Sequence, residues 1–374
     1  MKFVISSSVL SARLQMVGRA IAAKNNLPIL DCFLFETEGS ILKITASDNE
    51  TTLRTSVELT ECDANVRFAA SAKTIQDAMK EIPEQPLEFF FNEKNHEVTV
   101  EYRNGKYNFM AQPADEYPLP PALDENASGI SVAPQRLAEA VNRALFATAD
   151  DALRPVMNGI FFDIKAEDLT IVASDGHKLA CNKILNAPSP KEGSFIMPKK
   201  PATLLKNILG KADNEVAIRF DGRNAEVKTD GFEMTCRLIE GRFPNYASVI
   251  PKDNPNAVTV NRDAMIATLR RVLVFSSAVS SLVKVRLDAS KMTISSQDTD
   301  FSMSAEESLL CDYAGTPMSI GFKGPYLLEL INNLQGEEIV IRLADASRAG
   351  IIVPAEQKEG EEVLMLLMPM MLND

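Results

Sequence analysis

The hydrophobic and polar positions of the chain follow one plan three times, with a period of about 125 residues. Each copy opens with a short strand and an amphipathic helix. The apolar positions of the second copy's helix recur every three or four residues, at Leu137, Val141, Ala144 and Leu145. The predicted opening helices span residues 8–22, 134–146 and 262–273.

Each copy continues with a pair of strands around a polar turn, predicted at residues 32–36 with 41–46, 160–164 with 169–173, and 282–287 with 291–296. The second strand of each pair ends near an aspartate, namely Asp48, Asp175 and Asp298. A second helix follows, at residues 71–82, 199–209 and 324–334. Further strands close the copies, at 87–91 with 97–102 and at 216–220 with 225–228.

Proline-rich segments at residues 112–129 and 241–256 follow the first two copies and are typical of extended linkers. The pattern therefore predicts an α+β fold with three tandem domains, each holding two helices and two antiparallel sheets. We expect these domains at residues 1–120, 129–247 and 251–374.

Composition favours a folded protein, because 374 residues with 45% apolar and 24% charged side chains suit two or three cores. The first five residues lack the apolar core of a signal peptide, so we expect a cytoplasmic location. The most hydrophobic stretch, residues 363–372, is too short to span a bilayer. The five cysteines are scattered and lack C-x-x-C spacing, which disfavours disulfides and zinc. We expect neither a metal nor a cofactor.

The cations gather on the predicted helices although the formal net charge is −12. Several pairs are seven residues apart, which places both members on one helical face. A solvated face explains any single pair, but the repetition in all three copies favours sequence-independent contact with phosphates. The residues concerned are Arg19, Lys24, Lys73, Lys80, Arg136, Arg143, Lys199 and Lys206.

Domain size restricts how such a chain encloses DNA. A domain of about 125 residues has a diameter of roughly 35 Å. Three such discs in a ring leave a hole of about 5 Å and six leave about 35 Å, while a duplex is roughly 20 Å wide. A DNA-encircling ring therefore needs two chains joined head to tail.

Catalytic motifs are missing from the sequence, which has no G-x-S-x-G, phosphate loop or H-E-x-x-H. A non-enzymatic binding protein is the leading interpretation. Two alternatives stay open: a hydrolase that uses Asp175 and His177, and a scaffold that binds peptides but never DNA.

Three segments carry a family resemblance: Thr170 to Ala180, Glu240 to Tyr246 and Leu367 to Leu372. Together with Leu27 to Leu30, they resemble the beta subunit of bacterial DNA polymerase III, the sliding clamp family. The resemblance implies the clamp fold in three tandem repeats, with two chains forming a six-domain ring around duplex DNA. It also implies an ATP-driven loader and a pocket that tethers the polymerase III alpha subunit, other polymerases and repair proteins.

Carried over position by position, the resemblance places a partner-peptide pocket between the second and third domains. Methionine and leucine side chains suit it, because they adapt to different peptides. The last segment is otherwise interpreted as a final core strand, although Pro369 favours an edge. The implied pocket residues are Met157, Ser174, Gly176, His177, Lys178, Leu179, Pro244, Val249, Leu367, Met368, Pro369, Met370 and Leu372.

Two positions depart from the pattern of the family. Met371 and Leu372 stand where many relatives end in arginine and leucine, and Asn373 and Asp374 follow them. Ser248 stands where some relatives carry an arginine. Both differences weaken the expectation that acidic peptides are steered to the pocket by charge.

The resemblance further implies DNA contact at Lys24 and at the loop around Arg154. For dimer closure it implies that Tyr107 and Phe109 of one chain meet Val274 and Phe275 of the other.

Overall fold

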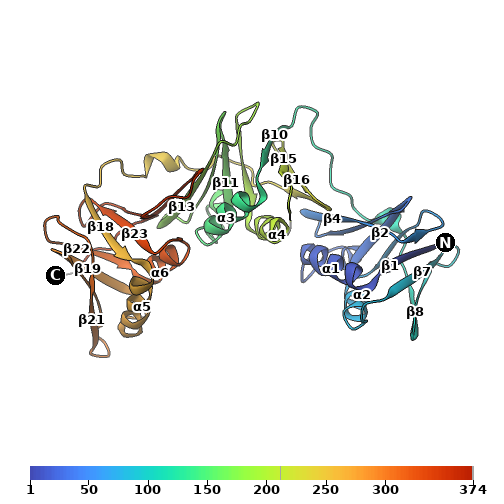
Figure 1. Ribbon diagram of the computed structural model, residues 1–374, viewed down its shortest axis with the longest axis horizontal. Helices are drawn as coiled ribbons and strands as arrows, with labels where there is room; N and C mark the ends of the chain where they lie inside the picture. The colour runs from blue at the N-terminus through green and yellow to red at the C-terminus, as the bar shows by residue number, and fades with distance from the viewer. Residues whose placement is uncertain (211, 373–374) are drawn as a thin grey trace. The chain divides into compact units, whose positions relative to one another are not determined.

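The computed structural model describes residues 1–210 and 212–372, which form six α-helices and 25 β-strands. The strands build four antiparallel sheets. Contacts within the chain group its helices and strands, which Figure 1 labels, into two compact units. The first unit contains residues 1–138 and 200–238, and the second contains residues 139–199 and 239–374.

The first unit holds two sheets. The smaller has the order β5-β1-β7-β8-β9, from Glu61–Cys62, Lys2–Ser6, Pro86–Asn92, Glu97–Tyr102 and Gly105–Met110. The larger has the order β10-β15-β16-β17-β4-β3-β2-β6, from Ser128–Val132, Val216–Phe220, Asn224–Thr229, Phe232–Arg237, Thr51–Glu58, Ile41–Ser47, Cys32–Glu38 and Arg67–Ser71.

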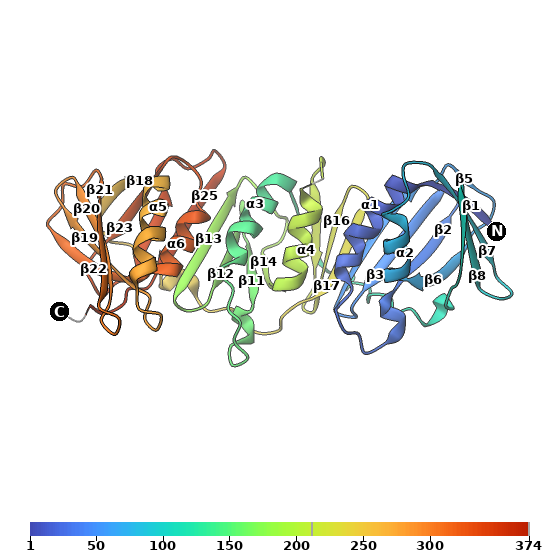
Figure 2. The same ribbon diagram turned by 90° about the horizontal axis from the view of Figure 1, so that it is seen from below.

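Helices α1 (Ser7–Val17) and α2 (Ala72–Met79) lie side by side over β2 and β3 of this larger sheet (Figure 2). Stacked phenylalanines fill the core of the first unit. The rings of Phe3 and Phe89 are 4.7 Å apart, and those of Phe35 and Phe68 are 5.1 Å apart. Each stacked pair adds about 0.5–1.5 kcal/mol to the stability that burial gives.

The second unit repeats the arrangement. Its larger sheet has the order β14-β11-β12-β13-β25-β24-β23-β18, from Gly193–Pro198, Gly159–Ile164, Asp168–Ser174, Lys178–Leu185, Glu361–Leu367, Gly350–Pro354, Glu338–Leu343 and Asn256–Asn261. Its smaller sheet has the order β21-β20-β19-β22, from Met303–Leu310, Lys291–Asp298, Leu282–Asp288 and Met318–Lys323.

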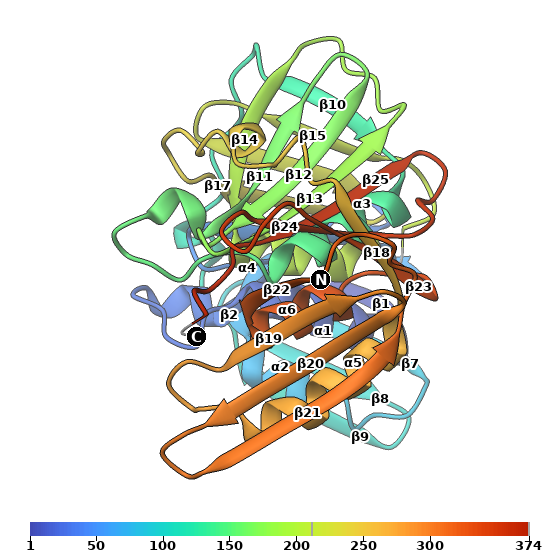
Figure 3. The same cartoon turned by 90° about the vertical axis from the view of Figure 1, so that its left-hand side faces the viewer.

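Helices α5 (Arg262–Val272) and α6 (Gly324–Asn332) lie side by side in the second unit. Figure 3 shows β19, β20 and β21 next to one another, with α5 behind them. The division between the units falls within α3 (Pro134–Leu145) and at the start of α4 (Lys199–Leu209).

A strand leads directly into every helix: β1 into α1, β6 into α2, β10 into α3, β14 into α4, β18 into α5 and β22 into α6. Polar side chains stop several of these strands and start the helices. Ser6, Ser71 and Asn261 each accept a hydrogen bond from the backbone N–H three residues later, and such caps typically stabilise a helix by about 1 kcal/mol.

The six predicted helices and the predicted strand pairs are confirmed, with ends that shift by a few residues. The prediction that each domain has two antiparallel sheets is confirmed, since each predicted domain contributes strands to two sheets, but two pairings extend these sheets across the predicted domain borders. β17 pairs with β4, and β13 pairs with β25, so four sheets result. The domain bounds themselves stay a prediction. Within the described ranges, no helix is both long and apolar enough to cross a membrane.

Candidate functional site

The repeated aspartates form tight turns after the second strand of each copy. Oδ1 of Asp48, Asp175 and Asp298 accepts hydrogen bonds from the backbone N–H groups two and three residues later, at 2.7–3.3 Å. Side chains of aspartate favour turns for this reason. The shared sequence signal therefore has a shared backbone role in all three copies.

The floor of the predicted peptide site is the junction of β13 with β25. Leu179 pairs with Leu366 across it, and both are buried. They belong to an apolar cluster with Phe243, whose ring stacks on Phe161 at 4.8 Å. Tyr246 packs against the same cluster and donates to Asp163 at 2.8 Å. Burial raises the pKa of the Tyr246 hydroxyl, so it remains a donor at neutral pH.

The last segment leaves the sheet after β25 ends at Leu367, so only its first part is a core strand. The N–H of Met368 donates to the carbonyl of His177 at 2.8 Å. The N–H of Met370 donates to the carbonyl of Gly321 in β22 at 2.8 Å, which forms an isolated β-bridge. Met371 is 79% exposed. Asn373 and Asp374 lie outside the described residues.

The Lys178 side chain is buried beneath this segment and links β13 to α6. Its ammonium donates to the Glu329 carboxylate. It also lies 4.5 Å from the centre of the Tyr326 ring and 5.3 Å from that of Phe146. Attraction between a cation and an aromatic face adds to the ion pair. Lys178 thus has a structural role below the site and presents no free charge there.

The predicted pocket residues all belong to the second unit, but their exposure differs. Met157, Leu179 and Leu367 are buried, whereas Val249 is 53% exposed. Ser174 donates to the carbonyl of Lys178 at 2.8 Å. Exposed side chains available to a ligand come from His177, Pro244, Val249 and Met368, with Pro369, Met370 and Leu372 partly buried.

Sequence patterns missed Tyr326, whose ring lies 6.3 Å from that of His177. Tyr326 lies in the first turn of α6, and nothing local distinguishes it from an ordinary helical residue. Only the long-range pairing of β13 with β25 brings α6 to this place.

Gly176 and Arg154 are neighbours. Gly176 has φ +91°, a left-handed conformation that favours glycine, and a Cβ there would lie 2.8 Å from Nη1 of Arg154. Arg154 is exposed and donates from Nε to Asp151 at 2.8 Å. This ion pair lowers the pKa of the Asp151 carboxyl.

The predicted cationic face contains one error, at Arg143. Its side chain is only 5% exposed and its guanidinium donates to Glu361 at 2.8 Å and to Glu139. Both carboxylates come from the same unit, so Arg143 forms a buried ion pair and offers no charge to DNA. Six other members of the set and the predicted loop residue Arg154 are exposed, and Arg136 is half-buried. The exposed ones are Arg19, Lys24, Lys73, Lys80, Arg154, Lys199 and Lys206.

Each unit has one smaller sheet that ends in an edge strand with apolar side chains. β9 is an edge of the first unit's smaller sheet and carries Tyr107 and Phe109, the former exposed. β21 is an edge of the second unit's smaller sheet, where Leu310 is 88% exposed. Val274, in the turn after α5, is 71% exposed.

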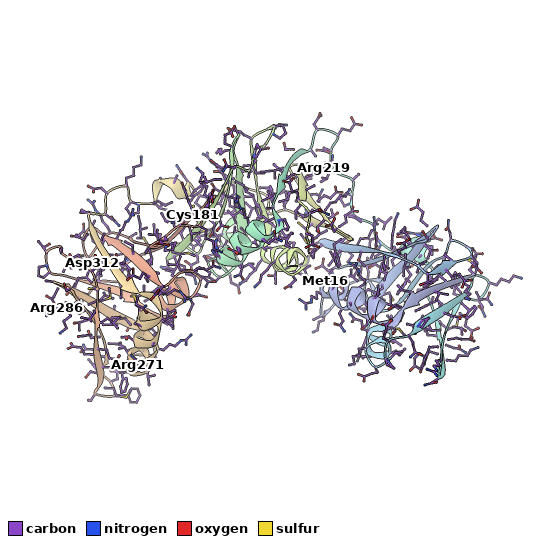
Figure 4. The ribbon with its side chains drawn as sticks, viewed as in Figure 1. Met16, Cys181, Arg219, Arg271, Arg286 and Asp312 are labelled. Carbon is purple, nitrogen blue, oxygen red and sulfur yellow. The ribbon has the colours of Figure 1, made fainter. Side chains whose placement is uncertain are left out.

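A charged residue of β21 forms an ion pair with a residue of the same chain. Glu307 accepts from Arg271 of α5, with 2.6 Å between Nη2 and Oε2. The hydrogen bond from Arg271 lowers the pKa of the Glu307 carboxyl. Arg271, Arg286 and Asp312, which Figure 4 labels, all belong to the second unit.

Metal-ligating side chains do not gather in the described part of the chain. No cluster of three histidine, cysteine or acidic side chains could hold a metal there. All five cysteines are free thiols. Burial raises the pKa of Cys181 to about 12, so this thiol stays protonated and unreactive at neutral pH.

Comparison with known families gives three consecutive matches. Residues 1–121 match the family model for the DNA polymerase III beta subunit, N-terminal domain. Residues 131–245 match the model for its central domain, and residues 247–370 match the model for its C-terminal domain.

Curated relatives agree along the whole length. The chain is 26% identical to the beta sliding clamp of Pseudomonas aeruginosa over 368 residues, which cover 98% of this chain and 99% of the relative. It is 27% identical to the beta sliding clamp of Haemophilus influenzae over 366 residues, which cover 98% and 99%.

A crystal structure of the Pseudomonas aeruginosa sliding clamp bound to griselimycin matches with a TM-score of 0.94 at 25% identity, covering 100% of both chains. The beta subunit of Thermotoga maritima matches with a TM-score of 0.90 at 26% identity, again over 100% of both. The chain therefore belongs to the DNA polymerase III beta subunit family, the beta sliding clamps.

Proposed function

We propose that two copies of this chain close into a ring around duplex DNA and tether the replicative polymerase and other partners to it. The observation that carries the proposal is the consecutive series of three family matches, over residues 1–121, 131–245 and 247–370. Six domains of this size leave a hole of about 35 Å, which accommodates a duplex roughly 20 Å wide.

Contact with DNA is made through phosphates and is independent of base sequence. Exposed cations on or next to α1, α2 and α4 support this, since the chain as a whole is acidic. Lys73 and Lys206 are exposed members of the set on two of these helices. Arg154 contributes from a loop, where phosphate competes with Asp151 for its guanidinium.

Ring closure joins the first domain of one copy to the third domain of the other. Two edge strands, β9 and β21, support a paired sheet across this interface, because an unpaired edge offers a row of backbone donors and acceptors. Val274 and Phe275 then meet Tyr107 and Phe109, which buries their exposed apolar surface.

Partners bind as short extended peptides on the site formed by the turn 174–178, Pro244, Val249 and the final segment 367–372. Its apolar anchor surface supports this, with Leu179 below and methionines at the rim. The occupants are the polymerase III alpha subunit, the clamp loader, other polymerases and repair proteins, and the ring acts in the cytoplasm.

The ring works without catalysis. The hydrolase alternative needs Asp175 to orient His177, but Oδ1 of Asp175 already accepts two backbone hydrogen bonds within its turn. Asp48 and Asp298 make the same bonds where no histidine follows, which supports a turn-forming role for all three.

Electron microscopy of the purified protein tests the ring directly. We expect particles with a central channel of about 35 Å, built from two chains. Compact particles without a channel, at any concentration that supports replication, would contradict the ring.

A further inference from the structure

Accessible methionine sulfur is concentrated in the final segment of the chain. Eight of the 15 methionines are buried, so an oxidant dissolved in water reaches the other seven more easily. Three of those seven lie within residues 368–371: Met368 is 42% exposed, Met371 is 79% exposed and Met370 is partly buried. The other four are scattered over the chain, at Met1, Met110, Met303 and Met318.

Backbone contacts fix the position of this segment. The N–H of Met368 donates to the carbonyl of His177, and the N–H of Met370 donates to the carbonyl of Gly321. A Cβ on Gly321 would lie 2.6 Å from the carbonyl oxygen of Met370, so glycine at this position lets the backbone of the segment lie directly on β22. A chemical change at the methionine sulfurs leaves all of these backbone contacts intact.

The segment forms the rim of the apolar part of the candidate peptide site. Leu179 and Leu366 are paired across the floor of the site and are buried. Val249 and Pro244 add exposed apolar side chains. Thioether side chains suit such a surface because they are flexible, polarizable and apolar. A peptide that binds there removes water from this surface, which favours binding.

Oxidation would make this rim polar. A sulfoxide oxygen accepts hydrogen bonds from water, and a bound peptide would exclude that water. The Lys178 ammonium beneath the segment already donates to Glu329. Because burial of a polar group without a hydrogen-bond partner is unfavourable, we expect an oxidised rim to hold peptides less tightly.

The chemical step needs a hydroperoxide as its only co-reactant. A lone pair of the thioether sulfur attacks one oxygen of hydrogen peroxide, so that an S–O bond forms and the O–O bond breaks. The transferred oxygen gives its proton to the departing hydroxide, which leaves as water. Methionine loses two electrons in this step, and the peroxide gains the same two.

We infer that Met368, Met370 and Met371 form an oxidation site, at which a hydroperoxide converts thioethers to sulfoxides and thereby releases partner peptides from the chain. This inference rests on the proposed function, because it concerns the same peptide site. Met371 stands where many relatives have arginine, so this chain offers an additional sulfur at the rim. The release is reversible, since methionine sulfoxide reductases restore the thioether.

Calorimetry on the full chain, before and after treatment with hydrogen peroxide, tests the inference. The probe is a short synthetic peptide with leucine and phenylalanine anchors and without methionine or cysteine. Mass spectrometry identifies the oxidised residues, and circular dichroism follows the fold. We expect sulfoxides in the final segment and at least tenfold weaker binding, with an unchanged circular dichroism spectrum. Treatment with the reductases for both sulfoxide epimers, which do not repair cysteine, should restore the affinity.

The triple variant Met368→Leu, Met370→Leu and Met371→Leu removes the three sulfurs. Its affinity after peroxide should stay within twofold of its own affinity before treatment. Met110→Leu, at a methionine that is 66% exposed in the first unit, is the matched control and should lose as much affinity as the parent chain.

Three results would overturn the inference alone: unchanged affinity of the parent chain with sulfoxides in the segment, an equal loss in the triple variant, or unfolding of the oxidised chain. No binding of the peptide to the untreated parent chain would overturn the proposed peptide site as well.

Discussion

Arg143 of α3 donates from Nη1 to Oε2 of Glu361 at 2.8 Å, and Glu361 is the first residue of β25. The two residues are 218 positions apart and are both nearly inaccessible to solvent. A buried ion pair of this kind holds α3 against the strand that also forms the peptide site.

Truncation of this arginine should cost stability and leave DNA binding unchanged. Arg143→Ala leaves the Glu361 carboxylate buried without its partner, so we expect the free energy of unfolding to fall by about 3–5 kcal/mol. Urea unfolding measures the loss. Arg143→Met keeps the side-chain volume but not the charge, so its free energy of unfolding should fall by nearly as much. The salt dependence of DNA binding should be unchanged in both variants.

The peptide site should depend on its apolar anchors. Met370→Ala combined with Leu179→Ala should weaken partner peptides more than tenfold, or about 1.4 kcal/mol, because Met370 offers surface that a peptide side chain covers and the buried Leu179 supports the floor beneath it. Calorimetry with a polymerase-derived peptide provides the measurement. Leu153→Ala, at an exposed leucine outside the site, is the control. Unchanged affinity in the double variant, with the dimer intact, would count against the pocket.

Charge reversal at exposed helical cations should reveal the DNA-facing surface. Lys73→Glu with Lys206→Glu should shorten the residence of loaded protein on DNA and lower the salt slope by about 0.9 for each phosphate that is no longer neutralised. Filter binding at several salt concentrations measures the slope. Lys94→Glu, at an exposed lysine of the β7–β8 turn, is the matched control. Identical salt slopes for the parent chain, the double variant and the control would contradict the assignment of Lys73 and Lys206 to the DNA-facing surface.

Dimer formation should fail when charged residues replace the apolar residues of the proposed interface. Val274→Asp with Phe275→Asp places two carboxylates in the proposed interface, so we expect monomers in analytical ultracentrifugation where the parent chain forms dimers. Val279→Asp is the control, because Val279 is also exposed but lies outside the proposed contact. A dimer of undiminished affinity in the double variant would require another interface.

The local sequence pattern predicted the helices and strands well. Each helix has apolar residues at helical spacing and follows a strand directly. Ser6, Ser71 and Asn261 show why: one side chain both stops the strand and caps the helix. The pairings of β17 with β4 and of β13 with β25 had no such local signal, since they depend on edges that meet only in the folded chain.

The candidate site was likewise predictable from the sequence only in its local parts. The turn at Asp175 and the final apolar segment are visible in the sequence, whereas Tyr326 and Glu329 become neighbours of Lys178 only through tertiary structure. Arg143 was misassigned because its helical position fits an exposed face, and its partner Glu361 lies far away in the chain.

Topological linkage to DNA is the central claim, and a loading experiment tests it most directly. The protein is loaded onto nicked circular DNA, the circle is isolated with its bound protein, and one restriction cut then linearises it. A closed ring should slide off the cut ends within minutes and stay on uncut circles. Protein that remains on the linear DNA as long as on the circle would show attachment to the surface and would contradict the account.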